Sequence, residues 1–388
     1  MTSQKTVSTF DPRHYDVFAG MDVDKRSIVV TFTDWEQSEK SIRMPYSSEH
    51  LLGYVRKHFP KKRIAFVYEA GPTGFGLFDD LGAKGHPCLV VAPSMVPRAP
   101  GQRVKTNRLD SKNLAKKLRG GDLQSIHVPS TTYRELRHLV QLRDTQVNQL
   151  AATKCRIKSL LTFEGIEFPA ENERWSAEVV RKLQELNCSG AVRFKLNILI
   201  QTLQFHFQSA AATHKELRRF CNNNSELQKT IALLTSIPGI GLTVATHLAA
   251  RLGDPSEITK LTQIAGFLGL AQSEHSTGNS QNRGPITRVG DSRLRSKLVQ
   301  SAWVAIHKDP ELLAFYQRIH GRNPKDAAAK KAIVAVARKL TTRIYAVLKQ
   351  QRPYVLRPHS SNISLTKVET GGPKGKTRRR TEGPTTKG

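Results

Sequence analysis

The stretch FAGMDVDKRSIVVTF, residues 18–32, is an apolar and β-branched run that carries a carboxylate, Asp22, inside it. Burying an ionised carboxylate is unfavourable by several kcal/mol unless a cation or hydrogen bonds compensate for it. Asp24 follows two residues later and would point to the same face of a strand. A divalent metal at the strand's edge would satisfy Asp22. The alternative is that both acids are turn residues at the mouth of a hairpin, which is commoner for an isolated Asp-x-Asp.

The first part of the chain alternates between strand-like and helix-like patterns, which predicts an α/β domain. One of the strands, IAFVYE, ends in a second carboxylate, Glu69, just before a Gly-Pro turn. In open α/β sheets, ligands bind at the carboxyl ends of the strands. The expected order is two strands over 18–34, a polar loop, a helix at 48–58, a strand at 63–69, a helix from about Gly74 and a strand at 87–97.

The composition indicates a protein that binds polyanions. The 388 residues include 61 Lys and Arg against 32 Asp and Glu, which gives a formal charge of +29, and the pI is near 10.2. The bases are spread along the chain, whereas a membrane surface favours a concentrated basic helix, so nucleic acid is the favoured partner. No long apolar run or signal peptide is present, so we expect a cytoplasmic protein without a membrane.

The cysteines exclude two other classes of protein. They lie far apart and show no Cys-x-x-Cys spacing, which argues against a zinc module and against a disulfide scaffold. The positions are Cys88, Cys155, Cys188 and Cys221.

Residues 98–119 are strongly basic, with eight Lys or Arg and a single acid, Asp110. A lone carboxylate in such a stretch is poorly explained as solubilising surface charge. Asp110 opens the helical run DSKNLAKKL, so it is a candidate N-cap and a candidate metal ligand, and the two roles are compatible. Lys105 and Arg108 from this stretch are candidate nucleic-acid contacts.

A long amphipathic helix is predicted from Ser130, because apolar residues recur at spacings close to three, four and seven. A break at 164–176 is followed by more helical sequence to about residue 233. These segments predict an antiparallel helical hairpin or coiled coil that serves either as a spacer or for dimerisation.

Residues 225–252 match a helix-hairpin-helix whose turn contains Gly239 and Gly241. Glycines at a helix N-terminus let backbone N–H groups approach a phosphate closely. The alternative is an ordinary tight connection between two core helices, which a Pro-Gly pair also makes.

The segment GLAQSEHSTGNSQNRGPITRVGDSRLRSKLVQSAW, residues 269–303, begins as a predicted mobile basic loop with Arg283 and Arg288. Asp291 then caps a helix that carries Arg293. Arg283, Arg288 and Arg293 are candidate nucleic-acid contacts. An exposed serine beside arginines suits nucleophilic attack on a phosphodiester. A final helix is expected at 326–350, and the remaining residues predict a disordered basic tail.

With these residues in place, the chain resembles the DEDD transposases of the IS110 family of insertion sequences, the bridge-RNA-guided recombinases related to the Piv invertase. Five ordered blocks carry the resemblance: GMDVDK, VYEAGPTG, GQRVKTNRLDSKNLAKKLRGGDL, SIPGIGLTVATHLAARLGD, and the run from GLAQSEHSTG to ITRVGDSRLRSKLVQSAW.

The resemblance implies a RuvC-like, RNase H-type α/β domain, a helical coiled-coil segment and a mainly helical transposase domain with the helix-hairpin-helix. We expect these over residues 1–128, 129–228 and 229–356, with the tail at 357–388. It also implies that Asp22, Glu69, Asn107 and Asp110 hold Mg²⁺ or Mn²⁺. Asn107 departs from the family, which has an aspartate there; its amide oxygen can still ligate Mg²⁺ but neutralises no charge.

The family's serine nucleophile falls on Ser276 or Thr277, and Ser276 is preferred because a primary hydroxyl is less hindered. Ser273 and Ser280 are weaker candidates. The implied reaction is metal-assisted strand exchange between donor and target DNA through a serine–DNA ester, with a structured guide RNA choosing the target. A site that combines the acids with a distant serine implies a homo-oligomer, from dimer to tetramer.

Two alternatives remain open. One is a RuvC-type nuclease or junction resolvase, which would use the acids and water without the serine. The other is a nucleic-acid-binding protein whose metal site has decayed, for which Asn107 is the best support.

Overall fold

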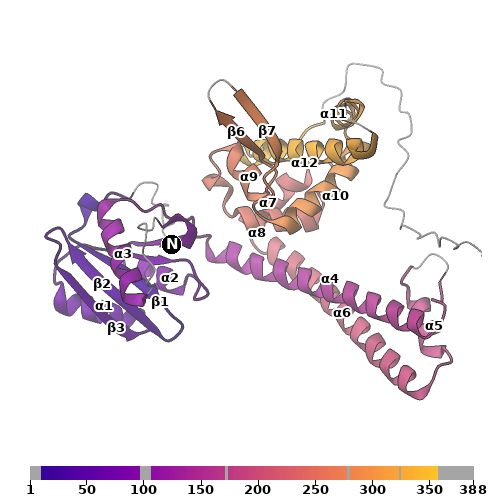
Figure 1. Cartoon of the computed structure of the whole chain (residues 1–388), viewed down its shortest axis with the longest axis horizontal. Helices are drawn as coiled ribbons and strands as arrows, with labels where there is room; N and C mark the ends of the chain where they lie inside the picture. Colours follow the sequence, from indigo (N-terminus) through magenta and orange to yellow (C-terminus); the bar gives the residue numbers. More distant parts are fainter. Residues whose placement is uncertain (1–9, 97–105, 171–173, 278–279, 323–324, 357–388) are drawn as a thin grey trace, which may run out of the picture. The chain divides into compact units, whose positions relative to one another are not determined.

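The computed structural model describes residues 10–96, 106–170, 174–277, 280–322 and 325–356, with the side chains of 275–283 and 325–327 excluded. The predicted tail and Lys105 lie outside these residues. The chain divides into two compact units, Met1–Thr131 and Thr132–Gly388, which are described separately. Figure 1 labels their elements.

Unit 1 is built on a five-stranded sheet in the order β3-β2-β1-β4-β5. The first three strands pair antiparallel, and β4 and β5 join β1 in parallel. The predicted α/β alternation is confirmed, but the expected polar loop is the edge strand β3, and β5 is shorter than expected. The strands are β1 (Val17–Val23), β2 (Ser27–Asp34), β3 (Glu39–Pro45), β4 (Ile64–Glu69) and β5 (Cys88–Val91).

Both faces of the sheet are covered by helices, which explains why its central strands are almost continuously apolar. On one face Ala19, Met21 and Tyr68 belong to a cluster with α1 (Ser48–His58) and α2 (Gly76–Ala83). On the other face Phe18 and Val67 pack with α3 (Asn107–Gly120). The short 3-10 helices of this unit are η1 (Pro12–His14) and η2 (Pro93–Met95).

Helix α3 lies directly on strand β1 at Gly20. A Cβ at Gly20 would lie 2.2 Å from the Ser111 carbonyl oxygen and 2.3 Å from the Ala115 nitrogen. The Ser111 hydroxyl is 2.8 Å from the Thr31 hydroxyl on β2, and Thr31 pairs with Gly20. The absence of a side chain at Gly20 therefore sets the distance between the helix and the sheet.

Unit 2 begins with two long helices, α4 (Thr131–Phe163) and α6 (Gly190–Asn222), with α5 (Ala177–Glu185) between them in sequence. They run antiparallel, because Leu160 and Leu196 share a cluster near one end and Val140 and Leu217 share another near the opposite end. The expected helical hairpin is present, as Figure 1 shows.

The rest of unit 2 packs helices around one large apolar core. The loop predicted after Gly269 is instead a hairpin of strands β6 and β7, paired from Gln272 with Ile286 to Thr277 with Ser280. None of the helices in the described ranges is both long and apolar enough to span a membrane. The elements are α7 (Ser225–Thr235), α8 (Leu242–Leu252), η3 (Pro255–Glu257), α9 (Leu261–Phe267), β6 (Gln272–Thr277), β7 (Ser280–Ile286), α10 (Ser292–Lys308), α11 (Pro310–Gly321) and α12 (Lys325–Gln350).

Substituting Gly20→Ala tests the contact between α3 and β1. The new methyl group would meet helix backbone that cannot rotate away, so we expect a loss of about 3 kcal/mol in the free energy of unfolding. Gly53→Ala in α1 is the matched control, because nothing lies within 4 Å of its Cβ position. That change should stabilise the chain by about 0.5–1 kcal/mol through helix propensity. Denaturant unfolding checks both, and equal effects would contradict the contact.

Candidate active site

Asp22 and Glu69 lie side by side at the carboxyl ends of two parallel strands. Met21 on β1 pairs with Tyr68 on β4, so the next residues in this register are Asp22 and Glu69. Side chains alternate along a strand, which places Asp22 on the same face as Gly20. That is the face covered by α3, and both acids are partly buried there. The predicted neighbourhood of these two carboxylates at the edge of the sheet is therefore present.

The first turn of α3 faces the same edge. Arg119 near the helix's end donates from Nη1 to the Asp34 carbonyl oxygen at 3.0 Å. Asp34 pairs with Val17 at the start of β1, so α3 runs antiparallel to β1. From Ser111 back to Asn107 the helix rises about 6 Å, which matches the rise of about 6.6 Å along a strand from Gly20 to Asp22. Asn107 is therefore level with Asp22.

Asp110 does not cap α3, contrary to one of its two predicted roles. Thr106 is the N-cap, and its hydroxyl accepts a hydrogen bond from the Leu109 N–H at 3.3 Å. Asp110 lies within the first turn, where a carboxylate also interacts favourably with the helix dipole. Asp24 is an exposed turn residue after β1, and its carboxylate accepts a bond from the Lys25 N–H at 2.7 Å. The turn interpretation is therefore correct for Asp24 and wrong for Asp22.

Strands β1 and β4 and helix α3 meet at one edge of the sheet, but their acidic side chains do not form a complete metal site. Among the described residues, no three His, Cys, Asp or Glu side chains lie close enough together to hold an ion. Asp22, Glu69 and Asp110 are thus brought to one edge by their elements, without forming a closed ligand set. Arg108 is exposed beside them on the first turn of α3.

The predicted nucleophile lies on a strand. Ser276 belongs to β6, where it pairs with Gln281 of β7. Its side chain and that of Arg283 lie outside the described residues. Ser273, a weaker candidate, donates from its hydroxyl to the Pro285 carbonyl oxygen at 2.9 Å across the hairpin.

The two glycines of the predicted helix-hairpin-helix differ in their surroundings. Gly239 has φ +85, and a Cβ there would lie 2.3 Å from the Ser301 carbonyl oxygen of α10. Packing between core helices therefore explains this glycine without a phosphate. Gly241 is exposed, precedes α8 and has nothing within 4 Å of its Cβ position. Arg288 is an exposed residue with φ 56, just after the hairpin.

A buried ionic network lies in unit 2 where α4, α8 and α10 meet. Asp144 accepts hydrogen bonds from His247 Nε2 at 2.9 and 3.0 Å and from Lys297 Nζ at 3.2 Å. His247 also donates from Nδ1 to the Thr243 carbonyl oxygen at 2.6 Å. The imidazole of His247 therefore bridges the Asp144 carboxylate of α4 and the backbone of its own helix. Asp144 and His247 are both buried.

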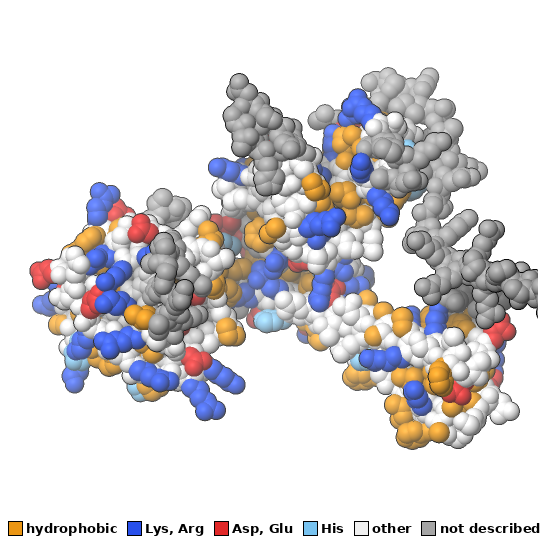
Figure 2. Space-filling model, viewed as in Figure 1, with side chains coloured by type: hydrophobic (Ala, Val, Ile, Leu, Met, Phe, Trp, Pro, Cys, Tyr) orange, Lys and Arg blue, Asp and Glu red, His pale blue; other side chains and the backbone are white. Residues whose placement is uncertain are grey.

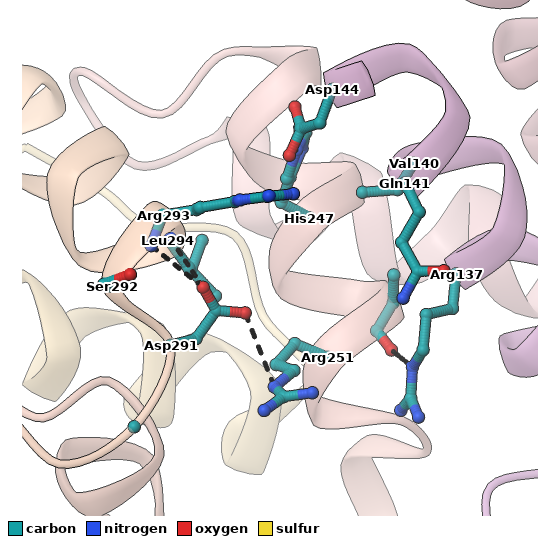
Figure 3. A pocket seen from close by; sticks show the side chains of 12 residues that line it. Arg137, Val140, Gln141, Asp144, His247, Arg251, Asp291, Ser292, Arg293 and Leu294 are labelled. Atoms are coloured by element: carbon teal, nitrogen blue, oxygen red, sulfur yellow. Dashed lines mark hydrogen bonds and ion pairs between the residues drawn. The ribbon is translucent and has the colours of Figure 1, made fainter. Parts of the chain in front are cut away.

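The network forms one wall of a pocket of about 330 Å³. Figure 3 shows Arg137 from α4, Arg251 from the last turn of α8 and Arg293 from the first turn of α10 around this space. Arg137 donates from Nε to the Ala250 carbonyl oxygen at 3.1 Å. Arg251 Nε lies 3.5 Å from an Asp291 carboxylate oxygen.

The charges around the pocket shift the pKa values of its side chains. Burial alone would raise the pKa of Asp144, but the hydrogen bonds and charges of His247 and Lys297 outweigh it and lower the pKa to about 2. Burial lowers the pKa of Arg137, and the positive charges of Arg251 and Arg134 lower it further. The pocket is therefore a crowded, cationic environment.

Sequence reasoning missed this pocket, although a signal was present. Asp144 interrupts the apolar positions of α4 that include Leu136 and Val140, and His247 interrupts the apolar helix LTVATHLAARL. A polar residue on an apolar face calls for a partner. Two such residues in different helices were candidates for each other.

Asp144→Asn should destabilise the chain in a pH-dependent way. The folded pKa of about 2 lies below the ordinary value of 3.8, so the carboxylate's stabilisation is complete above about pH 4 and disappears between about pH 4 and pH 2. We expect wild type to exceed the variant by about 2 kcal/mol near neutral pH. Thermal unfolding at successive pH values measures the gap, which should shrink below pH 4.

The matched control is Glu216→Gln, which removes an exposed carboxylate paired with Arg219. Screening by solvent weakens such a pair, so the unfolding midpoint should change little. A gap for Asp144→Asn that stayed constant down to pH 2 would contradict the charged network.

Comparison with known proteins identifies the family. Residues 19–165 match the DEDD transposase family of IS110, and residues 231–317 match the family described as "Transposase IS116/IS110/IS902 family". A putative transposase, y4qE, of Sinorhizobium fredii is 30% identical over 317 residues, which span 75% of this chain and 77% of the relative.

Two further relatives carry informative names. The pilin gene-inverting protein of Moraxella bovis is 34% identical over 146 residues, 37% of this chain and 44% of the relative. The transposase for insertion sequence element IS1111A of Coxiella burnetii is 24% identical over 260 residues, 64% of this chain and 68% of the relative. With matches at both ends and a relative aligned over three quarters of its length, the chain belongs to the IS110 family of insertion-sequence transposases.

Proposed function

We propose that this transposase cuts and exchanges DNA strands through a serine–DNA phosphoester, with a divalent metal held by its acids and a structured RNA choosing the target. The observation that carries the proposal is the register that puts Asp22 beside Glu69, level with the first turn of α3. An edge of a sheet with this set of oxygen donors suits phosphodiester chemistry better than a binding role alone.

The donors fit a hard cation. Asp22, Glu69 and Asp110 offer carboxylate oxygens and Asn107 offers an amide oxygen, and oxygen is the ligand that Mg²⁺ prefers. The ion would polarise the scissile phosphate and stabilise negative charge on its oxygens. Three carboxylates repel one another, whereas a cation bound between them attracts all three. The carboxylates would therefore approach one another only when the metal ion binds.

Asn107 weakens this site without abolishing it. An amide oxygen in place of a carboxylate keeps the ligand number but lowers the total negative charge by one. The predicted consequence is a lower affinity for Mg²⁺, with strand exchange intact at higher metal concentrations.

Ser276 is the proposed nucleophile. Its Oγ would form a bond to phosphorus as the bond from phosphorus to the leaving deoxyribose oxygen breaks, and the hydroxyl proton would end on that oxygen. The ester conserves the bond energy for rejoining, in which the steps are reversed. Nearby arginines such as Arg283 and Arg288 would neutralise charge on the phosphate.

The partners follow from charge and from the helical hairpin. Figure 2 shows Lys and Arg side chains spread over the visible face of both units, which suits the backbone of DNA and of a guide RNA. Large apolar side chains are also exposed on the hairpin, including Phe163 on α4 and Phe194 and Phe205 on α6. We propose that they pack against a second copy of the chain, which gives a dimer and, from dimers, a tetramer.

Ser276→Ala should abolish the covalent adduct between protein and DNA and the exchange of strands. Thr277→Ala and Ser273→Ala are the controls, since both leave the Ser276 hydroxyl in place. Denaturing gels with labelled DNA, from cells or extracts that supply the element's flanking sequence, detect the adduct. Metal-dependent cutting that survives Ser276→Ala would support the nuclease alternative instead.

The metal site is tested by two substitutions in opposite directions. Glu69→Gln keeps the shape and removes a charge, so we expect at least about a hundredfold loss of strand exchange. Asn107→Asp adds a charge, so half-maximal activity should occur at a lower Mg²⁺ concentration. We expect the wild type to be active. An inactive wild type that Asn107→Asp restores would instead show a decayed site.

A further inference from the structure

The pocket between α4, α8 and α10 holds more positive than negative charge. Its lining contains the guanidinium groups of Arg137, Arg251 and Arg293 against the carboxylates of Asp144 and Asp291. His247 also lines the pocket, and the Lys297 ammonium group lies 3.2 Å from the Asp144 carboxylate. Crowding of like charges is unfavourable unless an anion relieves it.

The two carboxylates do not neutralise the three guanidinium groups. Asp144 is already held by His247 and Lys297, with an Arg143 nitrogen at 3.8 Å. Asp291 accepts hydrogen bonds from the N–H groups of Arg293 and Leu294, both at 3.0 Å, as the cap of α10. Asp291 lies 3.5 Å from Arg251 Nε. The pocket therefore keeps a net positive charge of its own.

Arg293 is the least committed of the three guanidinium groups. Within the described residues its side chain forms no hydrogen bond or ion pair, and Figure 3 shows it extended across the pocket. Arg137 is fixed by the Ala250 carbonyl oxygen through Nε alone, which leaves its terminal nitrogens available to an anion. Guanidinium groups bind phosphate oxygens through paired N–H donors.

We propose that this pocket binds one phosphate group of a nucleic-acid backbone, with Arg137, Arg251 and Arg293 as its donors. The inference rests on the proposed function, in that it names a contact of the same nucleic acids. The pocket volume of about 330 Å³ is large enough to hold a phosphate group. The Asp144 network acts as a positioning element, because it fixes the three helices that carry the arginines.

The test compares the salt dependence of binding for the full chain and its variants. The probes are a DNA duplex and an RNA hairpin of the same sequence, titrated by fluorescence anisotropy over a range of salt concentrations. Each phosphate neutralised contributes about 0.9 to the slope of log K against log salt on duplex DNA and about 0.7 on single strands. We expect Arg293→Gln to reduce that slope by about 1 and to weaken binding roughly tenfold on at least one probe.

Two controls separate the pocket from general charge. Arg218→Gln removes one charge from an exposed position on α6 and should leave the slope unchanged. Arg293→Lys keeps the positive charge but lacks the paired N–H donors of a guanidinium group. It should therefore preserve most of the slope of log K against log salt. Whichever probe responds to Arg293→Gln identifies the nucleic acid that the pocket holds.

A second measurement uses the wild-type chain and does not depend on folding of a variant. Phenylglyoxal modifies free guanidinium groups, and peptide mass spectrometry locates the modified arginines. Bound probe should protect Arg251 and Arg293 and leave Arg218 reactive. Equal protection at all three positions, or unchanged slopes with both probes, overturns the inference.

The outcomes also distinguish the pocket from the proposed function. If the wild type exchanges strands and Arg293→Gln keeps the wild-type slope, only the pocket is wrong. If Arg293→Gln loses the slope while Ser276→Ala still exchanges strands, the pocket stands and the serine mechanism is wrong.

Discussion

The close approach of helix α3 to strand β1 is the constraint on which the candidate active site depends. Because Gly20 has no side chain, the backbone at Ser111 and Ala115 lies directly against the strand. This contact fixes the position of the helix along the strand, and with it the height of the first turn relative to Asp22. The parallel register of β1 and β4 places Glu69 beside Asp22 on the neighbouring strand. Two backbone contacts thus bring acids that lie far apart in sequence to one edge of the sheet.

In unit 2, a buried ionic network helps to fix the positions of helices α4, α8 and α10. There a buried carboxylate, Asp144, joins side chains from two other helices, and the unfavourable burial of charge is offset only while all of its partners are present. Such a network tolerates few alternative packings, since displacement of one helix would leave a charge unpaired. The arginines of the pocket are carried by the same three helices, so the network that stabilises the packing also orients the cationic groups. In unit 2 this ionic network adds to the packing of the apolar core, whereas the helix contact at Gly20 in unit 1 is made by backbone.

Features that depend on residues close together in sequence could be predicted, whereas contacts between distant residues could not. Asp22 and Glu69 stood out because each carboxylate ends an apolar strand, a signal contained within a few residues. The sequence of strand Glu39–Pro45 predicts a loop, because an edge strand exposes charged side chains, which also prevent edge-to-edge pairing. The hairpin at Gln272–Ile286 was missed since serine and asparagine are typical of loops, and pairing between its strands is not visible in composition. Asp144 and His247 are 103 residues apart in the sequence. Each residue alone indicates that a polar partner is needed, but the sequence does not show which residue that partner is.

The net charge links these two units to their substrate. A chain with a formal charge of +29 repels other copies of itself, and this repulsion opposes any active site assembled from more than one copy. A bound nucleic acid cancels much of that charge, so it favours assembly as well as supplying the reacting phosphate. The mechanism proposed above requires acids from unit 1 and a serine from unit 2, so a nucleic acid that offsets this repulsion would also favour that mechanism.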